Sequence, residues 1–81
     1  MTHVLLFGRL RDVAGWRERR VEPSPTTLYA LRALLGADDP GLCEALAAPG
    51  VQAAVDKALV RGDAALAADC EVAFLSPMSG G

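Results

Sequence analysis

The chain has 81 residues, of which 52% are hydrophobic and 22% charged. A chain of this length buries roughly 60% of its unfolded surface, which allows one modest core but no deep, enclosed active site beside it. The apolar content excludes a disordered chain. A net charge of −2 and a pI near 5.1 argue against a general nucleic-acid binder, whose domains carry a basic excess.

No membrane segment or signal peptide is expected. The most apolar segments, Val4–Phe7 and Val72–Leu75, are far shorter than the roughly 20 residues of a membrane span. No cationic leader or cleavage site precedes Val4, so we expect the chain in a reducing cytoplasm. Its two cysteines, Cys43 and Cys70, match no metal or redox spacing, and no metal site is predicted.

The first part of the chain reads as strand, turn and strand. His3–Phe7 reads as a strand, and its apolar run Val4–Phe7 is typical of a strand in the middle of a sheet. Arg9–Ala14 predicts a short helical turn closed by Gly15. Trp16–Glu22 is mainly charged with occasional apolar residues, as an exposed second strand would be, and Pro23 ends it because proline cannot donate to a ladder.

One strongly amphipathic helix follows. Thr26 is the predicted cap at its start, and Gly36 is predicted to end it in a left-handed conformation. Between them, three leucines fall on one helical face: Leu28, Leu31 and Leu35. This face is expected to pack on the sheet.

The second half predicts a short helix, a hairpin and a last strand. Asp39 can cap a helix over Pro40–Ala48, because proline suits the first helical position. Val51–Val60 reads as a hairpin with its turn near Asp56 and Lys57. After a polar and alanine-rich connection, Glu71–Leu75 reads as the final strand, because Val72–Leu75 are again apolar.

This order of elements predicts a mixed α+β sheet of the β-grasp, or ubiquitin-like, type. The first and last strands have the most apolar sequences, so they are expected to lie side by side in its centre. Hairpin partners flank them, and the main helix packs across one face. The domain is expected over residues 1–75, with residues 76–81 as a flexible C-terminal tail.

A single helix layer covers only one face of such a sheet. Because side chains alternate along a strand, one face collects Val4, Leu6, Val72 and Phe74, and the helix is expected to cover it. The other face collects Leu5, Phe7 and Leu75, with Leu59 nearby. An exposed apolar patch marks a partner site in a soluble protein, so Phe7, Leu59 and Leu75 are the candidate interface.

Catalytic motifs are lacking. The single histidine, His3, has no nucleophile in a recognisable motif beside it and reads as a solvated or satisfied strand-end residue. Asp38 and Asp39 read as a helix cap rather than a catalytic carboxylate pair. Cys43 lies near a predicted helix start, which leaves a reactive thiol open as an alternative. The arginine cluster is expected to be a solvated strand edge rather than an RNA-binding face: Arg9, Arg11, Arg17, Arg19 and Arg20.

The C-terminus carries the strongest functional signal. Two terminal glycines, Gly80 and Gly81, arise by chance in about 0.5% of chains. They present an α-carboxylate on a thin stalk that can pass through a narrow channel to an activating site, and their backbone adopts whatever conformation a partner enforces. The residues expected to be bound along that channel are Pro77, Met78, Ser79 and Gly80.

Four segments together resemble the small subunit of molybdopterin synthase, a ubiquitin-like sulfur carrier. They are an apolar strand with a short arginine-acid helix and glycine, a leucine helix, a hairpin and a Gly-Gly ending: residues 4–15, 26–35, 54–60 and 71–81. Three positions depart from the usual family pattern. Asp56 stands where asparagine is frequent, Asp69-Cys70 where Gly-Asp is frequent, and Ser76-Pro77 where Pro-Pro is frequent, which softens the tail.

The resemblance implies a sulfur-transfer cycle. A ubiquitin-activating-type adenylyltransferase would adenylate Gly81 with ATP, and a sulfur donor protein would convert it to a thiocarboxylate. The tail would then enter the large subunit, where sulfur passes to cyclic pyranopterin monophosphate in molybdenum cofactor biosynthesis. Catalytic side chains would belong to that subunit, in an assembly of two small and two large chains. No tightly bound cofactor, nucleic acid or membrane partner is implied.

Three other functions remain open. A sulfur carrier for thiamine thiazole or cysteine synthesis would share the fold and the activation chemistry, although thiamine-pathway carriers are usually shorter. A ubiquitin-like protein modifier would join Gly81 to lysines of other proteins. A plain interaction domain would have an inert tail.

Overall fold

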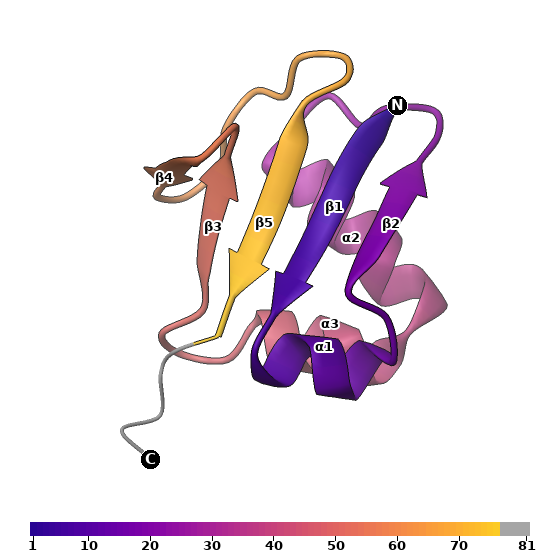
Figure 1. The fold of residues 1–81 in the computed structure, drawn as a ribbon, viewed down its shortest axis with the longest axis vertical. Helices are drawn as coiled ribbons and strands as arrows, with labels where there is room; N and C mark the ends of the chain where they lie inside the picture. The colour runs from indigo at the N-terminus through magenta and orange to yellow at the C-terminus, as the bar shows by residue number, and fades with distance from the viewer. Residues whose placement is uncertain (77–81) are drawn as a thin grey trace.

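The computed structural model describes residues 1–76 of the 81-residue chain. These residues form a five-stranded sheet with one longer helix (residues 28–38) behind it and two short helices (residues 9–14 and 40–46) at the end where the first and last strands finish (Figure 1). In chain order the elements are β1 (Thr2–Phe7), α1 (Arg9–Ala14), β2 (Glu18–Val21), α2 (Leu28–Asp38), α3 (Pro40–Leu46), β3 (Gln52–Val55), β4 (Ala58–Val60) and β5 (Glu71–Leu75).

The sheet has the order β2-β1-β5-β3-β4, with β1 and β5 parallel in its centre. In this pair Val4 lies opposite Val72 and Leu6 opposite Phe74. The hairpin partners β2 and β3 add antiparallel strands on either side, and β4 forms the far edge. The prediction that the first and last strands lie side by side within a β-grasp sheet is therefore confirmed.

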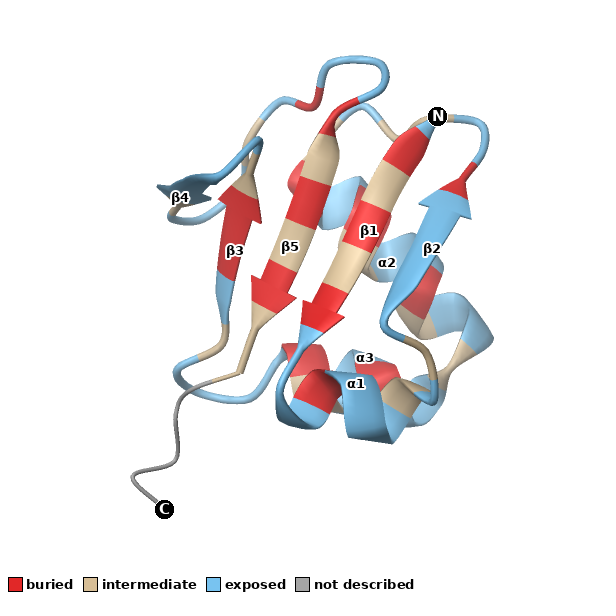
Figure 2. Ribbon diagram, viewed as in Figure 1, coloured by how far each residue is buried: buried red, intermediate tan, exposed pale blue. Residues whose placement is uncertain are grey.

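The core lies between the sheet and the helices. Figure 2 shows buried and half-buried residues alternating along β1 and β5, as a sheet with one covered face requires. The buried hydrophobic residues of these strands are the predicted ones, Val4, Leu6, Val72 and Phe74, and Thr2 at the start of β1 is buried with them. Three leucines of α2 and two of α3 pack against these hydrophobic residues: Leu28, Leu31, Leu35, Leu42 and Leu46. Burying each large apolar side chain stabilises the fold by about 1.5–3 kcal/mol.

Both predicted ends of the main helix are wrong. Thr27, rather than Thr26, caps α2, because its Oγ1 accepts a hydrogen bond from Ala30 N at 3.1 Å. The Thr26 carbonyl instead accepts a long-range bond from Leu66 N at 2.8 Å. At the other end, Gly36 does not stop the helix, which runs on to Asp38.

Gly36 serves helix packing instead. A Cβ added to it would lie 2.8 Å from both Cβ and Sγ of Cys43 on α3, which is closer than real side chains approach. The absence of a side chain therefore lets α2 and α3 approach closely. Asp39, between the two helices, caps α3 as predicted, because its Oδ1 accepts a bond from Leu42 N at 3.2 Å.

The remaining predicted elements are present: α1 and β5 have the predicted bounds, β1 begins one residue earlier, and α3 ends at Leu46 rather than Ala48. The second strand covers Glu18–Val21 rather than Trp16–Glu22, although the Arg17 carbonyl still accepts a bond from Leu6 N at 2.9 Å. The hairpin turns at Asp56 and Lys57, whose φ angles of 48° and 72° are those of a tight two-residue connection. Within residues 1–76, no helix has the length and hydropathy needed to span a membrane.

Candidate functional site

The uncovered face of the sheet, the open face, carries two rows of side chains set by the strand register. One row runs across four strands through Leu5, Ala73, Ala54 and Leu59. The next row contains Phe7, Leu75 and Gln52. Phe7 is 47% and Leu59 64% exposed, whereas Leu5 and Leu75 are half-buried. The three predicted interface residues therefore share one apolar face.

The register also spaces these residues. Phe7 and Leu75 are direct neighbours on β1 and β5. Leu59 lies on the edge strand, three strand spacings from Leu5, which is about 14 Å. Only alanines lie between them in that row. Because alanine side chains are short, the middle of the open face is shallow and a leucine lies on each side of it. A partner that binds the whole face needs a broad surface rather than a single protruding side chain.

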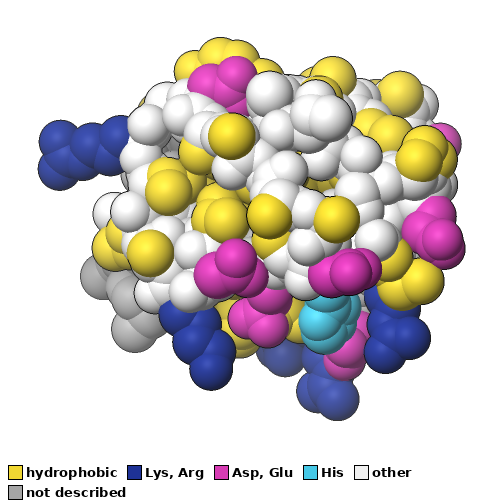
Figure 3. All heavy atoms as spheres, turned by 90° about the horizontal axis from the view of Figure 1, so that it is seen from above, with side chains coloured by type: hydrophobic (Ala, Val, Ile, Leu, Met, Phe, Trp, Pro, Cys, Tyr) yellow, Lys and Arg dark blue, Asp and Glu magenta, His cyan; other side chains and the backbone are white. Residues whose placement is uncertain are grey.

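The opposite end of the open face is charged. Because β1 and β5 are parallel, His3 pairs with Glu71 near their starts just as Phe7 pairs with Leu75 at their ends. His3 Nε2 lies 2.6 Å from an oxygen of Glu18 on β2. Figure 3, a view along the sheet, shows the histidine among acidic and basic side chains on one side of the molecule. His3 is thus the satisfied strand-end residue that the sequence indicates, and the open face is apolar only towards the end of β5.

The end of β5 is tied to the end of β1 through Ser76. Its Oγ accepts a hydrogen bond from Arg9 N at 3.0 Å and donates a longer one to the Phe7 carbonyl at 3.4 Å. Gly8, between these two residues, has a φ of 63°, and a Cβ there would overlap the Ser76 hydroxyl. We call this arrangement the Ser76 latch. It fixes the point and direction in which the chain leaves the sheet.

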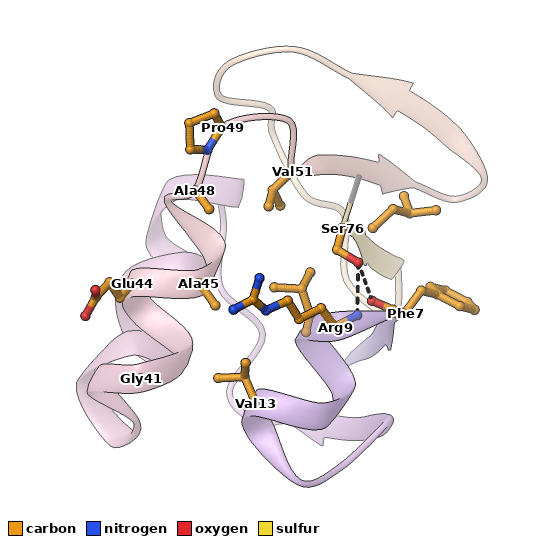
Figure 4. Close-up of a pocket in the computed structure, with 13 residues that line it drawn as sticks. Phe7, Arg9, Val13, Gly41, Glu44, Ala45, Ala48, Pro49, Val51 and Ser76 are labelled. Carbon is orange, nitrogen blue, oxygen red and sulfur yellow. Dashed lines mark hydrogen bonds between the residues drawn. The ribbon is translucent and has the colours of Figure 1, made fainter. Parts of the chain in front are cut away.

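A groove of about 910 Å³ opens beside the latch, between α1, α3 and the end of β5 (Figure 4). Its lining is mainly apolar, with one arginine and one glutamate: Phe7, Gly8, Arg9, Leu10, Val13, Gly41, Glu44, Ala45, Ala48, Pro49, Val51, Leu75 and Ser76. Sequence reasoning missed both the latch and the groove. The only available signal was a serine at a position where the resembled family has proline.

The two cysteines differ in burial: Cys43 is exposed at a helix contact and Cys70 is buried. Cys43 is exposed and stands against Gly36 at the contact between α2 and α3. Cys70 is buried, and this burial, together with the negative charge of Asp56, raises the pKa of its thiol. Within residues 1–76, no group of three or more histidine, cysteine or carboxylate side chains is arranged to hold a metal ion.

The predicted reactive terminus lies outside the described residues. This applies to Gly81, the predicted site of activation, and to the four residues expected to be bound along the partner's channel: Pro77, Met78, Ser79 and Gly80. Their assignments stay predictions. What the structure adds is the starting point of this segment, because Ser76 is held at the edge of the open face.

The fold and its open face are those of a ubiquitin-like protein, and comparison with known families agrees. The chain matches the ThiS family over residues 4–81 and belongs to this family of ubiquitin-like sulfur carriers. The match includes the Gly-Gly ending. Among curated proteins, the search found no significant match.

Solved structures show the same fold along nearly the whole chain. The crystal structure of SAMP1 from Haloferax volcanii is 25% identical, with a TM-score of 0.82 over 99% of this chain and 98% of that one. The solution structure of small archaeal modifier protein 1 from Methanosarcina acetivorans is 21% identical, with a TM-score of 0.85 over 99% and 95%. The Haloferax volcanii HVO 2177 protein, also solved in solution, is 23% identical, with a TM-score of 0.76 over 99% and 85%.

Proposed function

We propose that this chain is the sulfur-carrying small subunit of a molybdopterin synthase. Its Gly81 carboxylate is adenylated, converted to a thiocarboxylate, and used as the sulfur donor to cyclic pyranopterin monophosphate in the large subunit. The observation that carries the proposal is the family match, which extends through the Gly-Gly end. The resemblance to molybdopterin synthase small subunits supports the pathway, as does α3 (Pro40–Leu46), an element that the usually shorter thiamine-pathway carriers have less room for.

The chemistry follows from the low reactivity of a carboxylate. One oxygen of the Gly81 carboxylate attacks the α-phosphorus of ATP, and pyrophosphate leaves. The resulting acyl adenylate has a good leaving group, so sulfide-level sulfur (HS⁻) released by the donor protein attacks the carbonyl carbon, AMP departs, and the thiocarboxylate remains. The C-terminal residues supply a path to this carbon without side chains, because Gly80 and Gly81 carry none.

The folded domain provides the docking surface and determines how far the C-terminal segment can reach. The open face binds the activating partner and then the large subunit, with Phe7, Leu59 and Leu75 as its apolar contacts. Six residues, 76–81, follow β5, and they span at most about 20 Å. Each partner must therefore hold its reactive centre within about that distance of the Phe7–Leu75 end of the face.

Intact mass measurement tests the proposal. The purified chain is incubated with ATP, an activating enzyme of the ubiquitin type and a sulfur donor. We expect the mass to increase by the replacement of one oxygen with one sulfur. A chain that lacks only Gly81 is the matched control and should fold equally well but stay unmodified. An unmodified full-length chain, with partners that load another carrier, would contradict the sulfur-carrier function.

The pathway needs a second measurement on the loaded chain. With the large subunit and cyclic pyranopterin monophosphate, we expect the thiocarboxylate to revert to carboxylate as molybdopterin forms. Sulfur delivery only to a thiazole-forming or cysteine-forming system would assign the carrier to that other pathway.

Protein modification is the second candidate. The 25% identity with SAMP1 from Haloferax volcanii, which belongs to proteins named small archaeal modifiers, favours it. This function needs the same adenylate, but the attacking group is a lysine amine, so an amide bond to Gly81 forms and no sulfur is retained. Conjugates in which Gly81 is joined to lysines of other proteins, absent from the chain without Gly81, would support it.

A further inference from the structure

The groove between α1 and α3 is an apolar surface that no described part of the chain covers. Val13 of α1 is 40% exposed and lies across the groove from Ala45 of α3 and from Ala48, just beyond the end of α3 (Figure 4), and Leu75 also lines the groove. This side of the molecule is not the docking face, although Phe7 and Leu75 border both. An uncovered apolar groove of about 910 Å³ in a chain this small indicates a binding site.

The groove also contains a positive charge without a partner. Figure 4 shows the Arg9 side chain extending across the groove towards Ala45, while Glu44 on α3 points away from it. Within residues 1–76, the ion pairs are Met1–Asp69 and His3–Glu18, so Arg9 has no counter-ion there. A guanidinium set against apolar walls favours an anionic ligand, and a carboxylate matches its paired donors.

The chain's own C-terminal segment has the matching chemistry. It starts at the groove, because Ser76 lines it and is fixed there by the latch. The segment consists of two apolar residues, Pro77 and Met78, then three small ones, and ends in a carboxylate. Five residues span at most about 17 Å. Arg9 N lies 3.0 Å from Ser76 Oγ, so the guanidinium is only one arginine side chain away from the start of the segment.

We propose that the α1–α3 groove binds residues 77–81 of the same chain in the free carrier. Met78 contacts the apolar wall formed by Val13 and Ala45, and the Gly81 carboxylate pairs with Arg9. The contact is intramolecular, so its effective concentration is about millimolar and even a weak interaction is populated. A partner that docks on the open face must displace the segment before it can reach the terminus. The inference goes beyond the proposed function, because it holds whether Gly81 is converted to a thiocarboxylate or joined to a lysine of another protein.

NMR of the free chain tests this proposal. Spectra of the full-length chain and of a chain that ends at Ser76 are compared, without ATP or any partner. We expect chemical-shift differences at Val13, Ala45 and Ala48, and nuclear Overhauser contacts from the Met78 methyl group to this wall. Differences restricted to residues directly beside Ser76 would overturn the proposal.

Two changes test the ion pair from both sides. Arg9→Gln and a C-terminal amide in place of the Gly81 carboxylate should each lower the ratio of bound to free segment by about twofold to fivefold, the range of an exposed ion pair. Combined, they should give little further loss, because both remove the same interaction. Arg11→Gln is the matched control, since Arg11 is also on α1 but does not line the groove. Equal effects of Arg9→Gln and Arg11→Gln would contradict the assignment of Arg9.

Because this experiment contains no activating enzyme, its outcome is independent of sulfur loading. A chain that binds its segment but is never thiocarboxylated would leave this inference standing and overturn the proposed function. A chain that is thiocarboxylated normally but shows no chemical-shift differences in the groove would overturn this inference and leave the proposed function standing.

Discussion

The two faces of the sheet are built from alternate residues of the same strands, yet they differ in what surrounds them. On the covered face, Leu6 and Phe74 are at most 2% exposed because they share one core cluster with the leucines of α2 and α3. On the open face, the residues next in sequence, Phe7 and Leu75, reach solvent. Hydrophobicity is similar on both sides, so composition alone does not say which side is the core.

This difference separates stability from binding. Apolar area that is already buried in the free chain contributes to the free energy of unfolding. Apolar area that stays exposed contributes only when a partner covers it. The parallel β1–β5 pair places the exposed aromatic and leucine at the end where the C-terminal segment leaves, and the charged residues at the other end. Docking is therefore expected next to the reactive terminus.

The largest effect is expected from Phe74→Ala on the covered face. Phe74 is fully buried, so the change leaves a cavity and should lower the free energy of unfolding by about 3–5 kcal/mol. Phe7→Ala removes the same side chain from the open face and should cost less than about 1 kcal/mol, because Phe7 is half exposed. Urea denaturation of both variants measures the difference. Similar losses would show that the two faces are not distinct.

Partner binding should depend on the open face rather than on the covered face. Phe7→Arg places a charge in the apolar part of the open face and should weaken binding of the activating partner by at least about tenfold, with an unchanged melting temperature. Tyr29→Arg is the matched control: Tyr29 is an aromatic of α2 and 56% exposed, but it lies in the helix layer. Titration calorimetry of both variants tests the assignment. A collapsed melting temperature for Phe7→Arg would place Phe7 in the core instead.

Period-two alternation was enough to predict both faces of the sheet, because a strand leaves each side chain only two directions. It separated Leu6 and Phe74 from Phe7, and the expectation that the main helix covers the first set placed Leu6 and Phe74 in the core. The helix ends were less predictable. Thr26 and Thr27 are equally good caps in sequence, and the choice depends on Leu66, forty residues later, which binds the Thr26 carbonyl.

The latch and the groove could not be predicted for the same reason. Ser76 gains its hydrogen bonds from Arg9 and Phe7, at the other end of the sequence, and only the parallel pairing of β1 with β5 brings them together. Gly36 was misread because a glycine near the end of an apolar pattern is usually a stop signal. Its contact with Cys43 depends on how two helices pack, which no local pattern encodes.

The helix layer can be tested at two glycines. Gly36→Ala and Gly41→Ala both add a methyl group within a helix and both gain intrinsic helix propensity. The new Cβ at position 36 would lie 2.8 Å from Cys43, whereas at position 41 its nearest neighbour is 3.4 Å away. Gly36→Ala should therefore be less stable than Gly41→Ala by about 1–2 kcal/mol. Thermal denaturation of both variants measures this. Restored stability on adding Cys43→Gly would locate the strain at this contact.

The smallest expected effect is a loss of folding stability at alkaline pH that depends on Cys70 and not on Cys43. Burial raises the pKa of the Cys70 thiol, and the Asp56 carboxylate adds to it, so the folded chain holds its proton to higher pH than the unfolded chain does. The stabilisation is complete below about pH 8.5, where both states are protonated. It is lost as pH rises towards the folded-state pKa, because the unfolded state then binds fewer protons. Urea denaturation between neutral and alkaline pH should show this decline in the wild type and in Cys43→Ala, but a flatter curve for Cys70→Ala. An equal decline in all three would assign the pH dependence to other groups.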